Sequence, residues 1–541
     1  MNVLICTLNS QYIHSSLAPF CLLAGLKKYG DSGIYAEVIQ GTVNEDINMF
    51  AEKLIQKKPH VVGLSCYIWN IEKIYILAAL IKDRLPDTVT VLGGPEVSYN
   101  AATVLQNNNV DFVLSGEGEK PFALFINALK NNSSLENLPG LCRRTSSGIV
   151  VADPYVSAEE PPSPYTEEYF KALNGKIAYI ETSRGCPYNC AFCLSGRCGK
   201  ARFFNLDRAK KDIELLAQSG TKTIKFVDRT FNANKKRAKE IIRFITENLS
   251  QSGVCFHFEI AGDILDDELI LLLNSSPKGL FQLEIGLQSF NEKTLSEINR
   301  KTNTKNLKQN ISRLLEFQNV HIHIDLIAGL PYEDMQSFIN SFNIAFSLRP
   351  HMLQFGFLKL LHGSPMRENK EKYPCEFSKT PPYEVISTPW LTKEELSELH
   401  YAENALDRIY NSGRFSKTLE YVLKTKNISP YELFNSFGKY YSKTSSLDDL
   451  SKAFFDFFSD NTEEFRDCFV IDRLQTNASG KLPTFLKRTD SRLKEFKYTY
   501  PPKKGVTRGY AILYEENVFI YVDYENKDPV TGEYTITKIS L

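Results

Sequence analysis

The chain has 541 residues, 43% hydrophobic and 24% charged, a composition typical of a folded protein with two to four domains. Lysine plus arginine number 64, as do aspartate plus glutamate, so the zero net charge gives no general attraction to nucleic acid or to an anionic membrane. We therefore expect no nucleic-acid partner. No run of about 18 apolar residues occurs, so we also expect no membrane span.

The eleven cysteines are an odd number, and only those between Cys186 and Cys198 are clustered. This pattern argues against the disulfide framework of a secreted protein. The N-terminal MNVLICTLNSQ has no basic segment followed by an apolar core, so no signal peptide is predicted. We expect a reducing, cytoplasmic location.

Residues 1–135 alternate strand and helix signals. Apolar residues recur at helical spacing over 16–30, 44–58 and 71–85, and Gly30 is a suitable helix C-cap. Apolar runs predict buried parallel strands at Val3–Thr7, His60–Tyr67, Val89–Leu92 and Asp111–Leu114. Repeated strand–helix units of this size predict an α/β fold with an open, doubly wound, Rossmann-like sheet.

A proline-rich and acidic stretch, DPYVSAEEPPSPYTEEYF, interrupts this pattern, and 136–174 is predicted to be a linker. A second alternating series covers 175–378, with helical patterns at 206–220 and 235–249. It predicts a partial (β/α)6 barrel with its chemistry in the loops after the strands. The expected strands are 177–183, 222–228, 255–261, 280–289, 320–329 and 352–361.

Helical patterns dominate 379–541, including 391–410 and 445–458. The last residues alternate as in a small antiparallel sheet, with a turn at Asn526–Pro529. We therefore predict a mainly helical C-terminal domain with a small terminal β element, and it contains no catalytic motif.

Cys186, Cys190 and Cys193 form a C-x3-C-x2-C pattern directly after the expected strand 177–183. Three thiolates at this spacing can bind three irons of a 4Fe–4S cluster and leave the fourth iron open. Adding Cys198 would close the site, as in a structural zinc centre. A zinc loop or unligated thiols is the alternative, but the position at a barrel rim favours the cluster.

The stretch RGCPYNCAFC resembles the signature of radical S-adenosylmethionine (SAM) enzymes, with Phe192 at the aromatic position between the last two cysteines. The resemblance implies that the open iron chelates the amino and carboxylate groups of SAM. It also implies that an external electron donor, such as flavodoxin or ferredoxin, reduces the cluster and so yields a 5′-deoxyadenosyl radical. Cys198 is then a bystander on the following loop.

FHFEIAG, LEIGLQSFNEKTLSEINRK and IDLIAGLP resemble the later strands of the subgroup that contains coproporphyrinogen dehydrogenase. The resemblance implies that Glu259 contacts the SAM amino group and Arg300 its carboxylate. It also implies that Gln288 and Asp325 hold the ribose hydroxyls. These residue types suit the tasks, because a carboxylate accepts from ammonium and a guanidinium binds carboxylate in a forked geometry.

One segment departs from the family pattern. Many members end the second barrel strand in a Gly-Gly-Glu turn that receives the SAM amino group, whereas this chain has FVDRTFN at 226–232. Asp228 and Arg229 are expected to substitute in part, and Asp228 is included in the predicted SAM-binding set. Asp228 could equally cap a helix approach.

GLSCYIW, VLGGPEVS and LSGEGEKPF in the first domain resemble the cobalamin-binding Rossmann domain. There a serine contacts the dimethylbenzimidazole tail, and two glycines let the tail pack against bare backbone. Alone, Gly-Gly-Pro would more simply make a tight turn in a flavodoxin-like scaffold, and the fused radical SAM pattern favours cobalamin. The implied cobalamin-binding residues are Ser65, Gly93, Gly94, Pro95, Gly116 and Glu117.

The usual Asp-x-His-x-x-Gly cobalamin motif is missing after the first strand. The nearest stretch, YIHSSLA, supplies His14 but neither the aspartate nor the glycine. A metal-ligating imidazole needs an orienting partner. We therefore expect cobalamin without a protein histidine below the cobalt.

Nearly the whole chain resembles cobalamin-binding radical SAM proteins that carry a C-terminal domain of unknown function. The leading hypothesis is methyl transfer to an unactivated carbon, or to phosphorus, of an unidentified small-molecule or peptide substrate, with Tyr332, His362 and Arg367 as candidate cavity residues. The alternatives are a radical rearrangement or cyclisation without methyl transfer, and a non-catalytic metal-binding protein. Methylthiolation would need three more cysteines on a second cluster. Cys6, Cys21 and Cys66 are available, but their sequence contexts do not resemble that family.

Overall fold

A computed structural model describes residues 1–441, 443 and 446–540, without the Cys198 side chain. The chain divides into two compact units. Unit 1 comprises Met1–Ile260, Ile298–Arg300 and Lys359–Val385, and unit 2 comprises Ala261–Glu297, Lys301–Leu358 and Ile386–Leu541. Within the described residues, no helix combines the length and the apolar character needed to cross a membrane.

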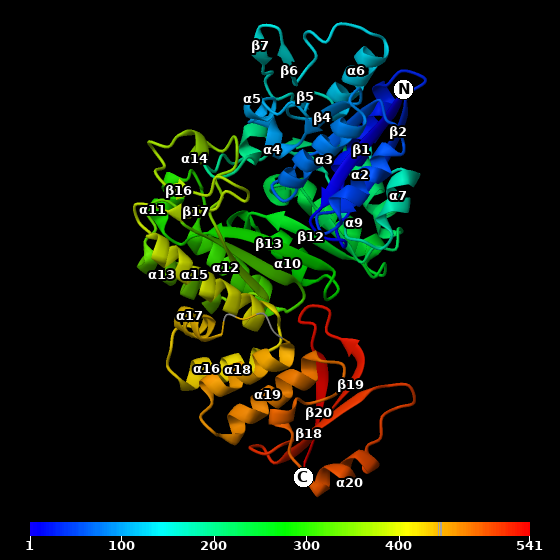
Figure 1. Ribbon diagram of the computed structural model, residues 1–541. Helices are drawn as coiled ribbons and strands as arrows, with labels where there is room; N and C mark the ends of the chain where they lie inside the picture. Colours follow the sequence, from blue (N-terminus) through cyan, green and yellow to red (C-terminus); the bar gives the residue numbers. More distant parts are fainter. Residues whose placement is uncertain (442, 444–445, 541) are drawn as a thin grey trace. The chain divides into compact units, whose positions relative to one another are not determined.

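Unit 1 begins with a seven-stranded sheet in the order β2-β1-β3-β4-β5-β6-β7 (Figure 1). Strands β1 to β5 are parallel, whereas β6 and β7 are antiparallel to their neighbours. The strand order reverses at β1, and a ligand crevice is expected at the carboxyl ends of β1 and β3. The strands are β1 Asn2–Asn9, β2 Tyr35–Thr42, β3 Val61–Ser65, β4 Val89–Gly93, β5 Phe112–Leu114, β6 Leu141–Thr145 and β7 Gly148–Val150.

Helices connect the strands of this sheet. Helix α1 packs beside α6, and α2 packs beside α3. The Asp46 carboxylate accepts hydrogen bonds from the N–H groups of Asn48 and Met49 and so begins α2. The helices are α1 Ala18–Tyr29, α2 Ile47–Ile55, α3 Ile71–Arg84, α4 Pro95–Ser98, α5 Ala101–Val104 and α6 Glu119–Lys130.

The predicted doubly wound sheet is confirmed, with three local differences. Strand β2 was not predicted because it is an edge strand whose side chains are mostly only half-buried, so YAEVIQGT lacks an apolar run. Gly30 follows α1 in an extended conformation, with φ −81° and ψ 147°, and not as a left-handed cap. The prediction that 136–174 is only a linker is wrong, because this segment contains β6, β7 and helix α7 (Glu167–Leu173).

The rest of unit 1 contains three parallel strands in the order β8-β11-β12. Strand β9 pairs with β10 in antiparallel fashion, beside the cysteine stretch. Helices α8 and α9 pack together and begin at the capping side chains of Asn205 and Asn234. The elements are β8 Ala178–Ile180, β9 Ser183–Arg184, β10 Arg202–Phe203, α8 Leu206–Ala217, β11 Thr223–Phe226, α9 Lys235–Leu249, β12 Cys255–Ile260, α14 Pro365–Glu368 and β16 Glu376–Phe377.

Unit 2 contains three further parallel strands in the order β13-β14-β15. Buried and half-buried residues alternate along β13, so one face of this strand is packed in the interior. All six strands predicted for the barrel region are therefore present, three in each unit. The elements are α10 Asp267–Asn274, β13 Phe281–Gln288, α11 Glu292–Glu297, α12 Thr304–Glu316, β14 His321–Ala328, α13 Met335–Ser347 and β15 Met352–Phe357.

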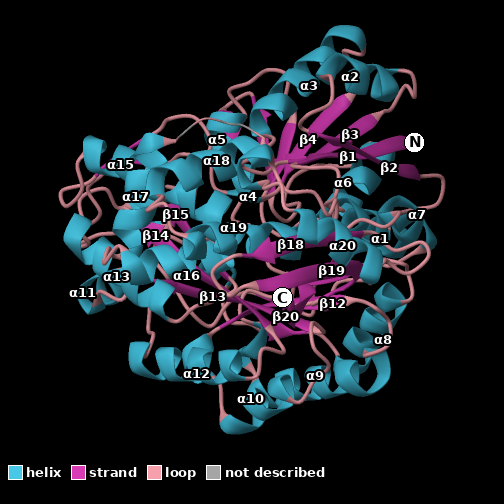
Figure 2. Ribbon diagram, turned by 90° about the horizontal axis from the view of Figure 1, so that it is seen from below, coloured by secondary structure: helices cyan, strands magenta, loops and turns pink. Residues whose placement is uncertain are grey.

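The C-terminal part of unit 2 is mainly helical and ends in an antiparallel sheet, β18-β19-β20 (Figure 2). A capping box between Thr392 and Glu395 begins α15. The predicted mainly helical region with a terminal β element is confirmed. The elements are β17 Val385–Ser387, α15 Lys393–Leu406, α16 Ser416–Thr425, α17 Pro430–Tyr440, α18 Leu447–Phe458, α19 Glu463–Thr476, α20 Ser491–Thr499, β18 Arg508–Leu513, β19 Val518–Lys527 and β20 Tyr534–Ser540.

Candidate cofactor site

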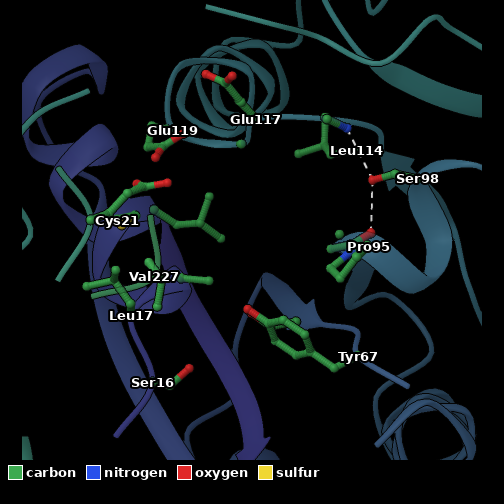
Figure 3. Close-up of a pocket in the computed structure, with 18 of the residues that line it drawn as sticks. Ser16, Leu17, Cys21, Tyr67, Pro95, Ser98, Leu114, Glu117, Glu119 and Val227 are labelled. Carbon is green, nitrogen blue, oxygen red and sulfur yellow. Dashed lines mark hydrogen bonds between the residues drawn. The ribbon is translucent and has the colours of Figure 1, made fainter. Parts of the chain in front are cut away.

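A cavity of about 910 Å³ lies at the carboxyl ends of the parallel strands of unit 1 (Figure 3). The loops after β1, β3, β4 and β5 form much of its wall. Residues beside the cysteine stretch complete it, namely Arg184, Gly185, Leu194, Ser195 and Arg197. One cavity is thus bounded both by the Rossmann-like sheet and by the segments that flank the predicted cluster ligands.

All six residues predicted to bind cobalamin line this cavity: Ser65, Gly93, Gly94, Pro95, Gly116 and Glu117. Gly94 has φ +117°, and a Cβ there would lie 2.5 Å from the Cys66 carbonyl oxygen. Gly116 has φ +91°, and a Cβ there would lie 2.3 Å from the Tyr155 backbone carbonyl oxygen. These two turns require glycine, which leaves bare backbone at the cavity wall.

Ser98 joins the two glycine turns and was not predicted as a site residue. Its hydroxyl donates to the Gly94 carbonyl at 2.9 Å and accepts from the Gly116 N–H at 3.2 Å (Figure 3). The Ser115 hydroxyl in turn donates to the Ser98 carbonyl at 2.5 Å. The serine in GGPEVS was the available sequence signal, but its partner is 18 residues away.

Tyr67 and Trp69 place an aromatic pair at the cavity wall, and the sequence reasoning missed both. Their rings are stacked, with centroids 4.5 Å apart and planes 4° apart. Burial raises the pKa of Tyr67 to about 12, so its phenol is neutral at physiological pH. The bare glycine backbone and these flat rings fit the large planar corrin ring of cobalamin.

His14 also lines the cavity. Its Nδ1 atom lies 2.7 Å from the Tyr179 hydroxyl, and burial, with Lys225 nearby, lowers the pKa of the imidazole. The contact with Tyr179 therefore fixes the orientation of the His14 ring. The expectation that no protein histidine lies below cobalt stays a prediction.

The cysteine loop follows β9 and is braced by two other segments of unit 1. The Ala191 N–H donates to the Ile298 carbonyl at 2.9 Å, and the Met366 N–H donates to the Ala191 carbonyl at 3.0 Å. The loop therefore depends on two segments that are distant in sequence, Ile298–Arg300 and Lys359–Val385.

The three predicted cluster ligands are neighbours within this loop. Burial raises the pKa of Cys190, Arg300 lowers it, and the nearby thiols of Cys193 and Cys186 raise it further. The Arg300 guanidinium lies 3.7 Å from the Cys190 sulfur, and the Ser195 N–H lies 3.4 Å from the Cys193 sulfur. Mutually repelling thiolates are stabilised when a metal ion or cluster binds them. The side chain of Cys198, predicted to be a bystander, lies outside the described residues.

The predicted SAM-binding residues occupy several environments. Arg300 lies beside Cys190, and its contact with the SAM carboxylate stays a prediction. The Asp228 carboxylate is 1% exposed and accepts hydrogen bonds from the Thr182 N–H, the Thr182 hydroxyl and the Ser183 hydroxyl. In this structure Asp228 therefore organises the approach to the cysteine loop. Phe192 and Glu259 are half-buried in unit 1.

Gln288 and Asp325 belong to unit 2. Gln288 ends β13 with φ +72°, a conformation that a non-glycine residue adopts at a cost and that clusters at functional sites. Donor atoms of Glu284, His323 and Asp325 lie within 4.8 Å of one another on β13 and β14, and His323 Nε2 is 2.9 Å from Asp325 Oδ1. Glu284 and His323 were not predicted, although strand alternation places them on the same face as Asp325.

The cysteines considered for a second cluster are not suited to it. Cys6 and Cys66 are fully buried in the core of the N-terminal sheet, and Cys21 is 8% exposed. Burial raises the pKa of all three thiols. Metal ligation requires thiolates, so these three residues give no support to methylthiolation.

Three family models match the chain. The B12 binding domain matches residues 3–126, the radical SAM superfamily matches 180–344, and a protein family of unknown function, DUF4080, matches 371–507. The chain belongs to the cobalamin-dependent radical SAM family. The cofactors typical of this family are a 4Fe–4S cluster, SAM and cobalamin.

Two curated proteins illustrate the range of relatives. The 2-(S-pantetheinyl)-carbapenam-3-carboxylate methyltransferase of Streptantibioticus cattleyicolor is 25% identical over 424 residues, covering 70% of this chain and 60% of the relative. The anaerobic magnesium-protoporphyrin IX monomethyl ester cyclase of Rubrivivax gelatinosus is 24% identical over 348 residues, covering 61% and 62%. The chain thus spans less than two thirds of the length of either relative. Most distant homologues are methyltransferases and some are cyclases.

The solved structure of OxsB, a cobalamin-dependent SAM radical enzyme with aqua-cobalamin bound, has a similar fold. The TM-score is 0.63 at 16% sequence identity, and the match covers 87% of this chain and 79% of that one. This likeness shows the shared architecture. Family membership rests on the family models, which match residues of all three regions of the chain.

Proposed function

We propose that this protein transfers a methyl group to an unactivated carbon of a small-molecule or peptide substrate. One observation carries the proposal: the residues suited to cobalamin and the residues flanking the cluster cysteines line the same cavity of unit 1. When bound, cobalamin and cluster-bound SAM supply a methyl carrier and a radical source. The protein's task is then to hold both beside one substrate and to exclude water.

On this proposal, the predicted site residues have distinct roles. Cys186, Cys190 and Cys193 would hold the cluster. Arg300, whose guanidinium lies 3.7 Å from the Cys190 sulfur, is proposed to fork onto a SAM carboxylate. Ser65 and the glycine turns would hold cobalamin against bare backbone, and the stacked rings of Tyr67 and Trp69 would offer it a flat apolar wall. Glu259, Gln288 and Asp325 are proposed SAM contacts, as the family resemblance implies.

Anaerobic reconstitution with iron, sulfide and cobalamin tests the proposal. The loaded protein would receive SAM with a deuterated methyl group, an external electron donor such as flavodoxin or ferredoxin with its reductase, and candidate substrates. We expect S-adenosylhomocysteine and 5′-deoxyadenosine in comparable amounts, with deuterium in a product detected by mass spectrometry. Cys186→Ala serves as the control and should form no 5′-deoxyadenosine. A loaded protein that never cleaves SAM would overturn radical catalysis.

A radical cyclisation or rearrangement is the second candidate, and the likeness to the magnesium-protoporphyrin ester cyclase favours it. The same experiment separates the two reactions. Formation of 5′-deoxyadenosine without S-adenosylhomocysteine and without label in the product would replace methyl transfer by this second reaction.

A further inference from the structure

Arg184 lies two residues before the first cluster cysteine, within a group of three carboxylates. Its Nε atom donates to both Glu181 oxygens at 2.9 Å. Its Nη1 atom is 3.2 Å from Glu117 Oε2 and 3.2 Å from Glu119 Oε2, and Nη2 donates to Glu119 Oε1. Nearly every donor of this guanidinium therefore has a carboxylate acceptor.

Two of these carboxylates come from the glycine-rich turn after β5, in the sequence Ser-Gly-Glu-Gly-Glu. Glu119 is in the first turn of α6, and Glu117 precedes it in the turn. Arg202 also donates a hydrogen bond to the Glu117 carboxylate and another to the Ser157 carbonyl. Arg202 lies opposite Arg184 in the antiparallel pairing of β10 with β9. The turn that borders the cobalamin cavity thus holds the strand that leads into the cysteine loop.

This group is largely shielded from water. The exposed fractions of the side chains are 14% for Arg184, 13% for Glu117, 9% for Glu119 and 19% for Glu181. At low exposure a charged hydrogen bond is strong and specific in geometry, and removal of one partner leaves the other charge uncompensated. The group therefore fixes the position of Arg184 more firmly than a surface ion pair would.

The backbone between Arg184 and Cys186 has little freedom. Gly185 has φ +84°, and a Cβ there would lie 2.8 Å from the Lys200 oxygen and 2.9 Å from the Gly199 oxygen. This single, tightly packed residue joins the anchored Arg184 to the Cys186 thiol, which lies 3.4 Å from the Thr230 hydroxyl. A shift of Arg184 should therefore be passed on to the first cluster ligand.

We propose that Glu117 and Glu119 are positioning residues that act through Arg184 on the Cys186 loop, and that they set the placement of the cluster relative to the cobalamin cavity. This inference rests on the proposed function, because it assumes a cluster on the three cysteines. It gives Glu117 a task other than the direct contact with cobalamin that the sequence resemblance implied. It also explains why two acidic residues follow the glycines of this turn.

The test uses the full chain loaded anaerobically with cluster and cobalamin. Glu119→Gln and Glu117→Gln each remove one charge while keeping the side-chain size, and Arg184→Lys keeps the charge while removing the fork. Glu159→Gln is the matched control, because the Glu159 side chain is 61% exposed and its ion pair with Lys120 is long, at 3.8 Å. The measurements are iron content, cobalamin affinity and melting temperature, together with the electron paramagnetic resonance spectrum of the reduced cluster with and without SAM. The yield of 5′-deoxyadenosine per labelled product is also measured.

We expect the three network variants to retain about four irons per chain, as a bound cubane requires, and to keep their cobalamin affinity. We expect them to change the SAM-dependent spectrum and to raise unproductive SAM cleavage about tenfold, because small misplacements at a reacting centre are costly. Arg184→Lys should resemble the Gln variants, and Glu159→Gln should resemble the unmodified protein.

Four results would overturn the proposal. Unchanged spectra with only a lower melting temperature would make the network a stabilising feature alone. A loss of cobalamin affinity in Glu117→Gln with an unchanged cluster spectrum would make that residue a direct cobalamin contact. If the unmodified protein forms no 4Fe–4S cluster, the proposed function fails together with this inference, whereas an active unmodified protein with silent variants rejects the inference alone.

Discussion

The cavity region of unit 1 and the C-terminal helices of unit 2 differ in the residues that they bury. Near the cavity, the chain buries charged groups such as Arg184 and Glu119 and uses left-handed glycines at strand ends. In the C-terminal part, rings fill the interior, and Phe454 packs edge-on against Phe437 and Phe469 with centroids 5.0 and 5.8 Å away. The first region leaves space beside directional polar groups, and the second leaves almost none.

This difference indicates where binding and where stability reside. The walls of a cavity lack the close apolar contacts of an ordinary core. A bound cofactor supplies such contacts and so stabilises the folded state. A closely packed aromatic core stabilises the fold without offering a site. Substitutions in the two regions should therefore separate cofactor readouts from stability readouts.

The largest effect is expected at the cluster. Cys193→Ala removes one of three thiolate ligands and should abolish the intact cluster, so that 5′-deoxyadenosine formation falls below about one thousandth of the unmodified rate, since the radical source is lost. Cys198→Ala, in the same loop, should keep about four irons and its activity. Iron analysis and chromatographic detection of 5′-deoxyadenosine check both variants. Loss of the cluster in Cys198→Ala would mean four thiolate ligands and a closed site.

The C-terminal core should respond in stability alone. Phe469 is 2% exposed and lies 5.3 Å, between ring centroids, from both Phe455 and Phe465. Phe469→Ala removes these contacts and should lower the free energy of unfolding by about 3–5 kcal/mol. Phe317→Ala, at a site 57% exposed, should change it by less than about 0.5 kcal/mol. Urea unfolding followed by circular dichroism measures both.

The cobalamin and iron content of Phe469→Ala tests whether the C-terminal core affects stability alone. If folded Phe469→Ala protein binds cobalamin and iron as the unmodified protein does, the C-terminal core is structural. A selective loss of cobalamin at a temperature where the variant is fully folded would show that this region shapes the site.

The sequence predicted most of the fold because buried parallel strands are continuous apolar runs. It missed the edge strands β2 and β7 and the adjoining β6, and it treated the proline-rich segment as a linker. The same logic applies to the site. Short local patterns identified Ser65 and the glycine turns, whereas the contact between Arg184 and Glu119 joins residues 65 positions apart and has no local signal.

Asp228 illustrates the limit of transferring a role by position. Its place after the second barrel strand predicted a contact with SAM, but the neighbouring backbone folds Thr182 and Ser183 onto its carboxylate. Hydrogen-bond partners are set by the loop conformation, which short motifs do not specify. The proposed SAM contact of Asp228 therefore needs a direct binding measurement.

A buried acid in unit 2 should make the folding stability depend on pH. Glu333 is fully buried, its Oε1 accepts hydrogen bonds from Ser289 and Ser341, and burial raises its pKa from 4.5 to about 7. Between these two values the unfolded chain loses the proton while the folded chain keeps it, so stability falls as pH rises, by up to about 3 kcal/mol. In contrast to the paired acids near the cavity, this group should penalise folding at high pH.

Glu333→Gln removes that titration. Urea unfolding at pH 5, 6, 7 and 8 should show the variant gaining stability relative to the unmodified protein as pH rises. Glu292→Gln, at an exposed position in the first turn of α11, controls for the loss of one carboxyl group. Parallel stability profiles for Glu333→Gln and the unmodified protein would mean that Glu333 is ionised in the folded state.

The smallest effect is expected on cobalamin affinity, in a comparison of two strand glycines that each have room for an added methyl group. A Cβ at Gly93 would have the Leu114 oxygen at 3.6 Å as its nearest neighbour, and a Cβ at Gly356 would meet nothing within 4 Å. Only Gly93 lines the cavity. Gly93→Ala should therefore fold but intrude on the bound cofactor, at a cost of about 1–3 kcal/mol, which weakens cobalamin binding by about 10- to 100-fold.

Gly356→Ala should leave cobalamin affinity unchanged, because the added methyl group lies in unit 2, on β15. Spectrophotometric titration of the apoprotein with hydroxocobalamin compares the two variants at matched stability. Equal affinity in both would mean that the corrin ring and its tail do not pack against the end of β4. A selective loss in Gly93→Ala would tie the cavity to cobalamin through a single methyl group, without any change in charge or hydrogen bonding.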